Sequence, residues 1–349
     1  MPCDVTATRL DTRTPLSSAE LAEALASVDG STCTATVIGY GTMGRQYVKA
    51  LRTLGVGRIR VCSRAPEPLA ELRGVRGIET LAGGIEHFNQ RADTDEVGMI
   101  ATPTASLRAA AERLMALGFR HLLIEKPVSL WSREIETVAE RCEAQGVEAY
   151  CAYNRVAYPA FHEVRARIAQ EGGVTSCTYT FTEIIKPDWP QRFPAQELAR
   201  WGIANSLHVM SLAHGLIGLP QRWSGERFGA LPWHPTGAVF VGYGVSTRSI
   251  PFTYHADWGS TGRWSVEVHT TRSSYRLCPL EQVFQRVAPT VDWTAVPVTA
   301  FAPQVKAGVT EQVAAMLDER LRASLPLMSL REAAALTRYG EGVFGYDAT

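Results

Sequence analysis

Two short motifs carry residue types that can bind an anion and polarise a reacting oxygen atom. The first is the glycine-rich run GYGTMG at residues 39–44, and the second is Glu125-Lys126-Pro127. Free backbone amides at the start of a helix bind phosphate groups, and a lysine ammonium stabilises negative charge that develops on an oxygen. The first motif therefore predicts what the chain binds, and the second predicts where its chemistry takes place.

The glycine-rich run lies where a strand is expected to turn into a helix. It follows the apolar residues Ala35 to Ile38 and opens the helical stretch Gln46 to Leu54. In such a turn Gly39 permits the tight bend, Gly41 lets a pyrophosphate approach the backbone, and Gly44 lets the helix pack on the strand. This context predicts a dinucleotide site, and the expected cofactor-binding residues of the motif are Gly39, Tyr40, Gly41, Thr42, Met43 and Gly44.

The end of the next expected strand predicts which dinucleotide is bound. Residues 58–62 (RIRVC) read as this strand, and Ser63-Arg64 follow it where an acidic residue commonly holds the ribose 2′-hydroxyl of NAD. A hydroxyl and a guanidinium instead suit a 2′-phosphate, because arginine binds phosphate through charge-assisted hydrogen bonds. The sequence therefore favours NADP(H), although a solvent-exposed arginine at a strand end is the simpler alternative.

The elements around these motifs indicate an α/β fold with two domains. Strand and helix patterns alternate from residue 32 to residue 152, which predicts a Rossmann domain with a doubly wound parallel sheet. After it, strand-like stretches at 175–185, 238–245, 250–258, 264–270 and 274–277 surround one apolar helix at 199–217. Residues 153–349 are therefore expected to form an α+β domain with a large open antiparallel sheet, which binds substrate and forms oligomers.

Residues 1–31 precede the first strand and are expected to be an N-terminal extension with one short helix. Ser17 and Glu20 have the spacing of a capping box, and Leu21, Leu25 and Val28 share one face of the helix that follows. This apolar face is expected to pack against the nucleotide domain or a partner subunit.

Composition excludes several classes of function. The 349 residues contain 35 basic and 35 acidic side chains, so no excess of positive charge points to nucleic acid or an anionic membrane. The N-terminus lacks the apolar core of a signal peptide, and a cytoplasmic protein is expected. The seven cysteines include no C-x-x-C pair, which favours reduced thiols over a zinc site, and no bound metal is expected.

GYGTMG, the turn Ala101-Thr-Pro-Thr104 and the run LLIEKPVSL at residues 122–130 together resemble the glucose-fructose oxidoreductase and inositol dehydrogenase family, Gfo/Idh/MocA. The resemblance extends from about Thr34 to the final helices. It implies a Rossmann domain followed by an open antiparallel sheet whose face meets the nicotinamide. It also implies that Lys126 contacts the substrate oxygen and that the peptide bond before Pro127 is cis. Ala101, Thr102, Pro103, Glu125 and Lys126 complete the expected cofactor site.

His208 is the second catalytic candidate, because the family carries a histidine on the corresponding helix. Relatives commonly have an aspartate four residues before it, but this chain has Ala204 there and Asn205 at the next position. An amide orients other groups by hydrogen bonds and cannot carry a proton. We therefore expect Lys126 and His208, helped by Asn205, to replace the usual three residues. The alternative for His208 is a buried histidine with a purely structural role.

Four further residues are weaker candidates for substrate binding. Tyr153 and Arg155 follow the last Rossmann strand, where the family often places an arginine that faces substrate or cofactor; an interdomain salt bridge is the alternative. Trp189 lies in the expected loop 186–189, and Asp257 lies in the aromatic stretch YHADW at 254–258. With His255, Arg263 and Trp264, these side chains suit a ring that bears several hydroxyl groups.

The sequence thus predicts an NADP(H)-dependent oxidoreductase that acts on a sugar, a nucleotide sugar or a cyclitol, with Lys126 polarising the oxygen and His208 supplying the proton. Two alternatives stay open, a cyclic imine reductase of the same fold and a dinucleotide-binding regulator without turnover. The expected partners are a small-molecule substrate and further copies of the chain. A homodimer or homotetramer is expected through the C-terminal sheet, whose Phe240, Tyr243, Trp264 and Tyr275 need cover.

Overall fold

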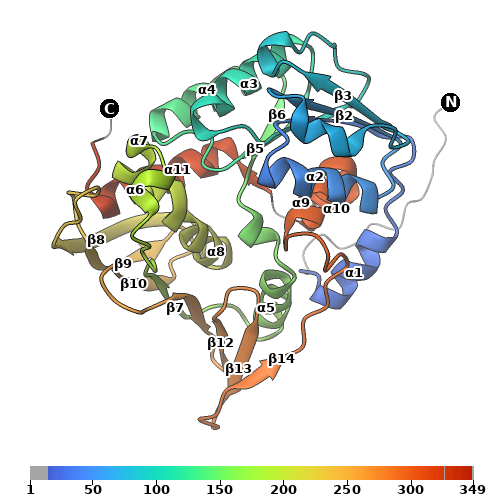
Figure 1. Ribbon diagram of the computed structural model, residues 1–349. Coiled ribbons are helices and arrows are strands. Elements are labelled where there is room, and N and C mark those ends of the chain that lie inside the picture. The colour runs from blue at the N-terminus through green and yellow to red at the C-terminus, as the bar shows by residue number, and fades with distance from the viewer. Residues whose placement is uncertain (1–14, 326, 348–349) are drawn as a thin grey trace.

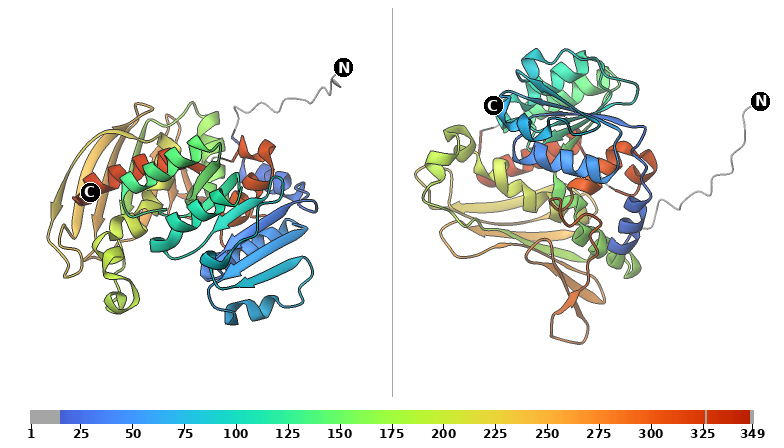
Figure 2. Two further views of the ribbon diagram at one scale, coloured as in Figure 1. Left: turned by 90° about the horizontal axis from the view of Figure 1, so that it is seen from above. Right: turned by 45° about the vertical axis from the view of Figure 1, so that its right-hand side comes forward.

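A parallel sheet and a mostly antiparallel sheet form the two halves of the molecule (Figure 1). The structure is a computed structural model that describes residues 15–325 and 327–347. Figure 2 shows that helices lie between the two sheets and that one face of the larger sheet is left without helices. This arrangement confirms the expected fold class, a Rossmann sheet followed by a large open sheet.

The Rossmann sheet has the strand order β15-β6-β5-β4-β1-β2-β3. Its strands are β1 (Thr34–Ile38), β2 (Arg58–Ser63), β3 (Ile78–Ala82), β4 (Val97–Ile100), β5 (His121–Glu125), β6 (Glu148–Ala152) and β15 (Met328–Ser329). All neighbours pair in parallel except β15 with β6. The carboxyl ends of β1, β2, β4 and β5 therefore share one edge, which is where such sheets bind ligands.

Helices cover both faces of this sheet. They are α2 (Thr42–Thr53), α3 (Thr104–Ala116), α4 (Ser132–Ala144), α9 (Val309–Leu317) and α10 (Glu319–Arg322), with the 3₁₀ turns η1 (Glu67–Leu72) and η2 (Ile85–His87) near β3. Helix α9 packs on α2, and β15 pairs with β6, although both belong to the C-terminal part of the chain. Helices α9 and α10 and strand β15 thus return to the Rossmann half, whereas the sequence alone predicted a simple change of domain after residue 152.

The second sheet has the order β14-β13-β12-β11-β7-β10-β9-β8. Its strands are β7 (Ser176–Phe181), β8 (Pro220–Phe228), β9 (Val239–Ser246), β10 (Pro251–Asp257), β11 (Trp264–His269), β12 (Ser273–Leu277), β13 (Val283–Val287) and β14 (Thr294–Val296). Only β7 and β10 pair in parallel. Five of these strands are predicted from alternation, whereas β8, β13 and β14 are absent from the sequence prediction.

Helices α8 (Leu207–Ile217) and α11 (Leu330–Phe344) cover the inner face of the second sheet. Phe344 packs edge-on against Phe240 with ring centroids 5.0 Å apart. Phe240 and Tyr275 are fully buried on this side, so the expectation that they lie on an uncovered face is wrong. Tyr243 is 65% exposed on the opposite face, because residues alternate between the faces of a strand.

The N-terminal helix forms as the sequence predicts. Helix α1 (Ser18–Ala26) begins with a complete capping box between Ser17 and Glu20, and Leu21 and Leu25 are buried in the core of the Rossmann half. Ser18 Oγ also donates a hydrogen bond of 2.8 Å to Glu163 on α5 (Pro159–Gln170). The predicted extension before residue 15 lies outside the described residues.

The apolar stretch 199–217 is not the single helix that its composition suggests. Short helices α6 (Trp189–Arg192) and α7 (Ala195–Ala199) are followed by a π-helical turn, η4 (Gly202–Ser206), and then by α8. A Cβ atom at Gly202 would lie 2.2 Å from the Phe344 ring, so a glycine permits the close contact with α11. A π turn widens the helix and is frequent at functional sites. No helix of the described ranges combines the length and apolar character needed to cross a bilayer.

Candidate active site

The glycine motif has the geometry that a bound dinucleotide needs. Gly39 has a φ of +96°, and a Cβ atom there would lie 2.5 Å from the Ala101 carbonyl oxygen. A Cβ atom at Gly44 would lie 1.9 Å from the Gly39 carbonyl oxygen, so α2 packs tightly on the turn. At Gly41 a Cβ atom would meet nothing within 4 Å, which leaves open space beside the backbone. The three glycines therefore fit a pyrophosphate bound at the start of α2.

A cleft of about 720 Å³ lies along the carboxyl edge of the Rossmann sheet. Of the residues expected to bind the cofactor, those that line it are Gly39, Tyr40, Gly41, Met43, Ser63, Arg64, Ala101, Thr102, Pro103, Glu125 and Lys126. Gly44 lies beneath the turn and Thr42 is exposed at the start of α2. Arg192, Phe193, Pro194 and Glu197 of the second half line the cleft as well, which the sequence did not predict.

The end of the cleft at β2 contains one positively charged and one negatively charged side chain. Ser63 is buried, while Arg64 is exposed and lines the cleft. Glu86 of η2 also lines it, and both Glu86 and Arg64 lie close to Gly84, from whose Cβ position they are 2.7 and 3.2 Å away. Sequence reasoning missed Glu86, because it lies far along the chain from β2 and the sequence gives no sign of their proximity.

Tyr40 contacts Glu71 and Arg45 beside the glycine turn. Its hydroxyl donates a hydrogen bond of 2.6 Å to Glu71, and the guanidinium of Arg45 lies 4.7 Å from the centre of its ring. Burial and the neighbouring Glu71 carboxylate raise the pKa of Tyr40 to about 12. The hydroxyl of Tyr40 therefore stays neutral, and its contacts stabilise the glycine turn.

Lys126 lies at the inner end of the dinucleotide cleft, directly after β5. The peptide bond between Lys126 and Pro127 is cis, as the family resemblance implies. Lys126 Nζ donates a hydrogen bond of 2.7 Å to the carbonyl oxygen of Ala204, in the π turn of the second half. Burial lowers the pKa of Lys126 to about 8. An ammonium that is held by one carbonyl keeps two further N–H groups for a ligand.

The neighbouring Glu125 is buried and does not pair with Lys126 at the surface. Its carboxylate is buried and accepts a hydrogen bond of 2.6 Å from the Tyr47 hydroxyl. Burial raises the pKa of Glu125. Glu125 therefore anchors the end of β5 to α2, and Lys126 is left to point toward the second half.

His208 lies against Arg155, and this contact bears on the role expected for it. Arg155 Nη1 lies 2.9 Å from Nδ1 and 3.0 Å from Nε2 of the imidazole, and Tyr153 packs edge-on against the ring. Burial, and then the positive charge of Arg155, lower the pKa of His208 well below its ordinary value. His208 is therefore neutral near pH 7, which does not suit it to give up a proton as an imidazolium, and its expected role as the proton donor stays a prediction. Its neutral ring can still orient Arg155 or a substrate oxygen.

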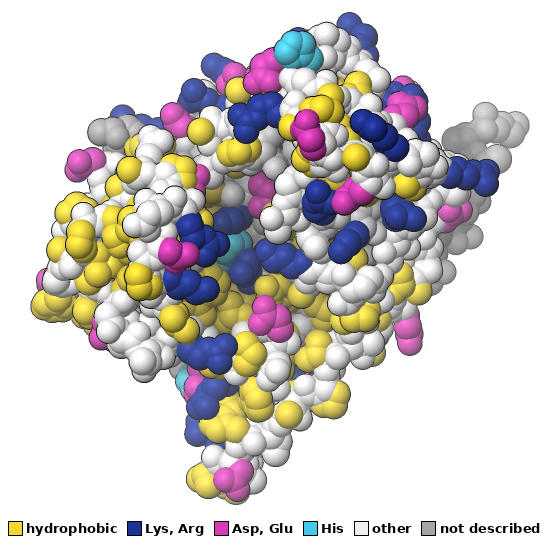
Figure 3. Space-filling model, in the orientation of Figure 1, with side chains coloured by type: hydrophobic (Ala, Val, Ile, Leu, Met, Phe, Trp, Pro, Cys, Tyr) yellow, Lys and Arg dark blue, Asp and Glu magenta, His cyan; other side chains and the backbone are white. Residues whose placement is uncertain are grey.

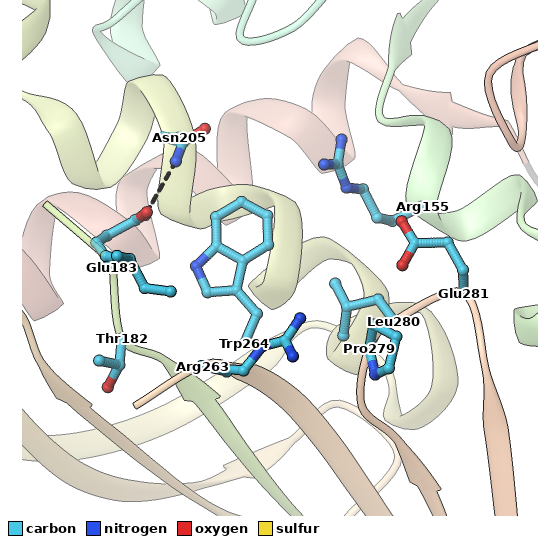
Figure 4. A pocket seen from close by; sticks show the side chains of 10 residues that line it. Arg155, Thr182, Glu183, Asn205, Arg263, Trp264, Pro279, Leu280 and Glu281 are labelled. Carbon is cyan, nitrogen blue, oxygen red and sulfur yellow. Dashed lines mark hydrogen bonds between the residues drawn. The ribbon is translucent and has the colours of Figure 1, made fainter. Parts of the chain in front are cut away.

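A second pocket, of about 350 Å³, opens beyond these residues (Figure 4). The Trp264 ring stands between Glu183 with Asn205 on one side and Arg155 with Glu281 on the other. The polar lining consists of Arg155, Thr182, Glu183, Asn205, Arg263 and Glu281, and the apolar lining of Ile184, Trp264, Pro279 and Leu280. Polar edges around one aromatic face suit a polyhydroxylated ring.

Asn205 binds a different partner from the one its position in the sequence suggested. Its amide nitrogen lies 3.1 and 3.0 Å from the two carboxylate oxygens of Glu183, just after β7. Burial raises the pKa of Glu183 to about 7. Glu183 was not predicted from the sequence, because it comes close to Asn205 only where the end of β7 meets the π turn.

Three of the weaker candidates lie outside the second pocket. Trp189 is buried, with its ring centroid 4.4 Å from that of Trp201, so it belongs to an aromatic cluster. Asp257 accepts a hydrogen bond of 2.9 Å from the Gly259 amide and shapes the turn after β10. Tyr153 is fully buried beneath His208. These contacts correct the expected direct roles of Trp189, Tyr153 and Asp257 in substrate binding.

The hollow between the two halves gathers positive charge. Figure 3 shows Lys and Arg side chains around its mouth and a histidine at its centre. Lys126, Arg155 and Lys306 each contribute to lowering the pKa of His208. Such a concentration of positive charge attracts anionic ligands into the cleft. In the described ranges no cluster of His, Cys, Asp and Glu side chains is arranged to hold a metal ion.

Comparison with known proteins assigns the nucleotide-binding half to a family. Residues 33–153 match the model GFO_IDH_MocA, described as an oxidoreductase family with an NAD-binding Rossmann fold. This domain belongs to the Gfo/Idh/MocA family. The family match covers the glycine turn, the Lys126 motif and the whole of β1 to β6. No curated protein matches the sequence.

Solved structures share the fold along nearly the whole chain. The UDP-N-acetylglucosamine 3-dehydrogenase of Acidithiobacillus ferrooxidans has a TM-score of 0.67 at 15% identity, with 90% of this chain and 98% of that chain covered. An inositol dehydrogenase homolog of Azotobacter vinelandii, solved with NADH and myo-inositol, has a TM-score of 0.71 at 14% identity, with 91% and 97% covered. Levoglucosan dehydrogenase, solved with NADH, has a TM-score of 0.69 at 15% identity, with 90% and 96% covered. At these identities the similarity shows a common fold.

Proposed function

We propose that this protein is an NADP(H)-dependent oxidoreductase that interconverts a hydroxyl and a carbonyl group on a polyhydroxylated ring. The observation that carries the proposal is the position of Lys126. Its ammonium lines the dinucleotide cleft and is held by Ala204, whose neighbour Asn205 lines the second pocket. A bound nicotinamide would supply or accept hydride, and Lys126 is the group beside that site that can stabilise charge on the substrate oxygen.

Each part of the site has a distinct task in this proposal. The amides at the start of α2 hold the pyrophosphate, and Arg64 holds the 2′-phosphate. Lys126 polarises the reacting oxygen. In the second pocket Asn205 and Arg155 position the other hydroxyl groups, and the Trp264 ring packs against a ring face. His208 acts as a neutral hydrogen-bonding group next to Arg155.

The substrate class is proposed from the chemistry of the second pocket. Its charged and amide groups would lose hydrogen bonds to water on binding an apolar ring, which does not replace them. The similar structures named above are a UDP-N-acetylglucosamine 3-dehydrogenase, an inositol dehydrogenase homolog with bound myo-inositol, and levoglucosan dehydrogenase. These neighbours support a sugar, nucleotide sugar or cyclitol.

A panel of substrates tests this proposal. NADPH oxidation is measured with ketosugars, nucleotide ketosugars, inosose-like cyclitols, plain cyclohexanone and cyclic imines. We expect a polyhydroxylated ring to react fastest. Faster turnover of cyclohexanone or of a cyclic imine would contradict the proposed substrate class. Binding of NADPH without turnover anywhere in the panel would favour a dinucleotide-binding regulator.

Arg64→Asp is expected to weaken NADPH binding far more than NADH binding. The variant removes a favourable charge pair with the 2′-phosphate and adds a repulsive one. Glu86→Gln is the matched variant at the same end of the cleft, and the loss of its negative charge should strengthen NADPH binding. Isothermal titration with both cofactors measures these changes. Equal affinities of the unmodified protein for NADPH and NADH would contradict the proposed preference.

We also propose that the uncovered face of the second sheet joins copies of the chain into a homodimer or homotetramer. Tyr243 and Phe228, 65% and 55% exposed, are large apolar side chains on β9 and β8. Packing of two such faces would remove this apolar surface from water. Light scattering at micromolar concentration is expected to give at least twice the mass of one chain, and the mass of a monomer would contradict the proposal.

A further inference from the structure

The second pocket contains a buried carboxylate for which the tasks above give no role. Glu183 follows β7, and only 4% of its surface is exposed. Its side chain nevertheless lines the pocket, facing the space between Asn205 and Trp264 (Figure 4). A carboxylate at the wall of a substrate pocket and shielded from bulk water is placed to exchange a proton with a ligand rather than with solvent.

The π turn holds this carboxylate in place. Asn205 donates hydrogen bonds of 3.1 and 3.0 Å to its two oxygens, and Ser206 Oγ donates one of 2.7 Å to Oε1. An ionised carboxylate has about four acceptor positions, so these contacts leave room for a substrate hydroxyl. The same turn presents the Ala204 carbonyl to Lys126. One short element therefore positions both the lysine and the carboxylate.

Lys126 is assigned to the charge on the reacting oxygen, and the other neighbouring groups are poorly placed to carry the proton. Position 204 is an alanine, and the His208 ring is held neutral by burial and by Arg155. Glu125 is occupied with Tyr47 at the base of β5. Among the acids described around the two pockets, Glu183 is the one that is buried, borders the substrate space and is hydrogen-bonded to the π turn that also contacts Lys126.

We propose that Glu183 is the catalytic acid and base of this site. This inference rests on the proposed oxidoreductase function. In the oxidative direction the substrate O–H bond breaks and its proton goes to a carboxylate oxygen of Glu183. The electron pair of that bond forms the C=O bond, while the C–H hydrogen leaves as hydride to the oxidised nicotinamide dinucleotide. In the reductive direction the protonated Glu183 returns its proton to the oxygen, and Lys126 stabilises the charge on that oxygen in both directions.

The surroundings of Glu183 match this role. Burial raises its pKa to about 7, and the hydrogen bonds from Ser206 and Asn205 and the charge of Lys126 partly oppose that rise. The other titratable or charged groups of the pocket are Arg155, Arg263 and Glu281, with His208 next to Arg155. Near pH 7 Glu183 therefore holds a proton part of the time, which suits a group that both takes and gives one.

The pH dependence of turnover tests the proposal in the intact protein with NADP⁺ and the best substrate of the panel. Oxidation needs the ionised carboxylate, so turnover should rise with pH through a midpoint near 7. Glu183→Gln should lower turnover by about 10²-fold and abolish this rise, with NADPH affinity unchanged. Ser206→Ala removes a hydrogen bond that favours the ionised form, so its midpoint should move to higher pH. Glu281→Gln is the control at the opposite wall of the pocket. Its turnover should rise with pH through the same midpoint as that of the unmodified protein, even if its rate differs.

A second measurement needs no turnover. Infrared difference spectra of the protein between pH 5 and 9 should show carboxylic acid absorption that titrates near pH 7. Glu183→Gln should lose part of this band, while the part from Glu311, whose pKa burial also raises to about 7, should remain. The same rise of turnover with pH in Glu183→Gln, or no decrease of that band, would overturn the role of Glu183 while leaving the proposed function intact. Absence of turnover by the unmodified protein with every substrate would overturn both.

Discussion

Lys126→Met is expected to lower turnover by about two orders of magnitude or more, while the affinity for NADPH stays close to that of the unmodified protein. Methionine has a similar length and fills the same space, but it offers no positive charge to an oxygen that gains negative charge in the transition state. Steady-state kinetics gives the change in kcat, and isothermal titration gives the affinity for NADPH.

The same variant is not expected to unfold the protein. The pKa of Lys126 is lowered to about 8 in the folded state, below the ordinary value of lysine, because burial disfavours its charged form. Below pH 8 the ammonium therefore costs folding free energy, and this cost disappears as the pH rises from the folded pKa to the unfolded one. Thermal unfolding at pH 7 should thus show no loss of stability in Lys126→Met. An unchanged kcat in Lys126→Met would show that Lys126 takes no part in the reaction.

Gly41→Ala and Gly44→Ala are expected to damage the dinucleotide site in different ways. At Gly41 a Cβ atom has open space, so the folded protein should keep its stability while NADPH binding falls by at least tenfold, because the methyl group meets the pyrophosphate. At Gly44 the Cβ atom would lie 1.9 Å from the Gly39 carbonyl oxygen, so α2 must move. We expect this variant to lose about 2 kcal/mol or more of stability as well as NADPH binding.

Thermal unfolding and isothermal titration on both glycine variants separate the two effects. A stable Gly41→Ala protein that binds NADPH with unchanged affinity would place the pyrophosphate elsewhere. A Gly44→Ala protein with unchanged stability would contradict the close packing of α2 on the glycine turn.

The cofactor site could be predicted from the sequence because its parts are local. The glycine run and Lys126 follow directly after a strand, and Ser63-Arg64 lie at the end of β2. Parallel strands bring their carboxyl ends to one edge. Glu86 escaped prediction since η2 reaches this edge only through the folding of the segment after β3. Local motifs thus predict most of the residues that line the cleft. A residue such as Glu86, which changes the charge of the cleft, reaches it only through tertiary contacts.

The substrate site could be predicted less well, because it forms between elements that lie far apart in the sequence. An ordinary helix would place Asn205 next to His208, but the π turn directs it to Glu183. Tryptophan is a residue type that suits a sugar site, yet Trp189 packs in an aromatic cluster with Trp201. The strand β8 consists mainly of exposed and polar residues, so it lacks the alternation by which β7 and β10 are recognised.

Transfer of deuterium from NADPH tests the central claim most directly. The protein is incubated with NADPH deuterated at carbon 4 on one face, and in a parallel sample on the other face, together with the best ketone substrate of the panel. Proton NMR and mass spectrometry of the product show whether the label has moved. The proposed function predicts one deuterium on the carbon that bears the new hydroxyl, from one of the two labelled cofactors only. Reduction of the substrate without label in the product from either cofactor, or no reduction while NADPH is bound, would contradict it.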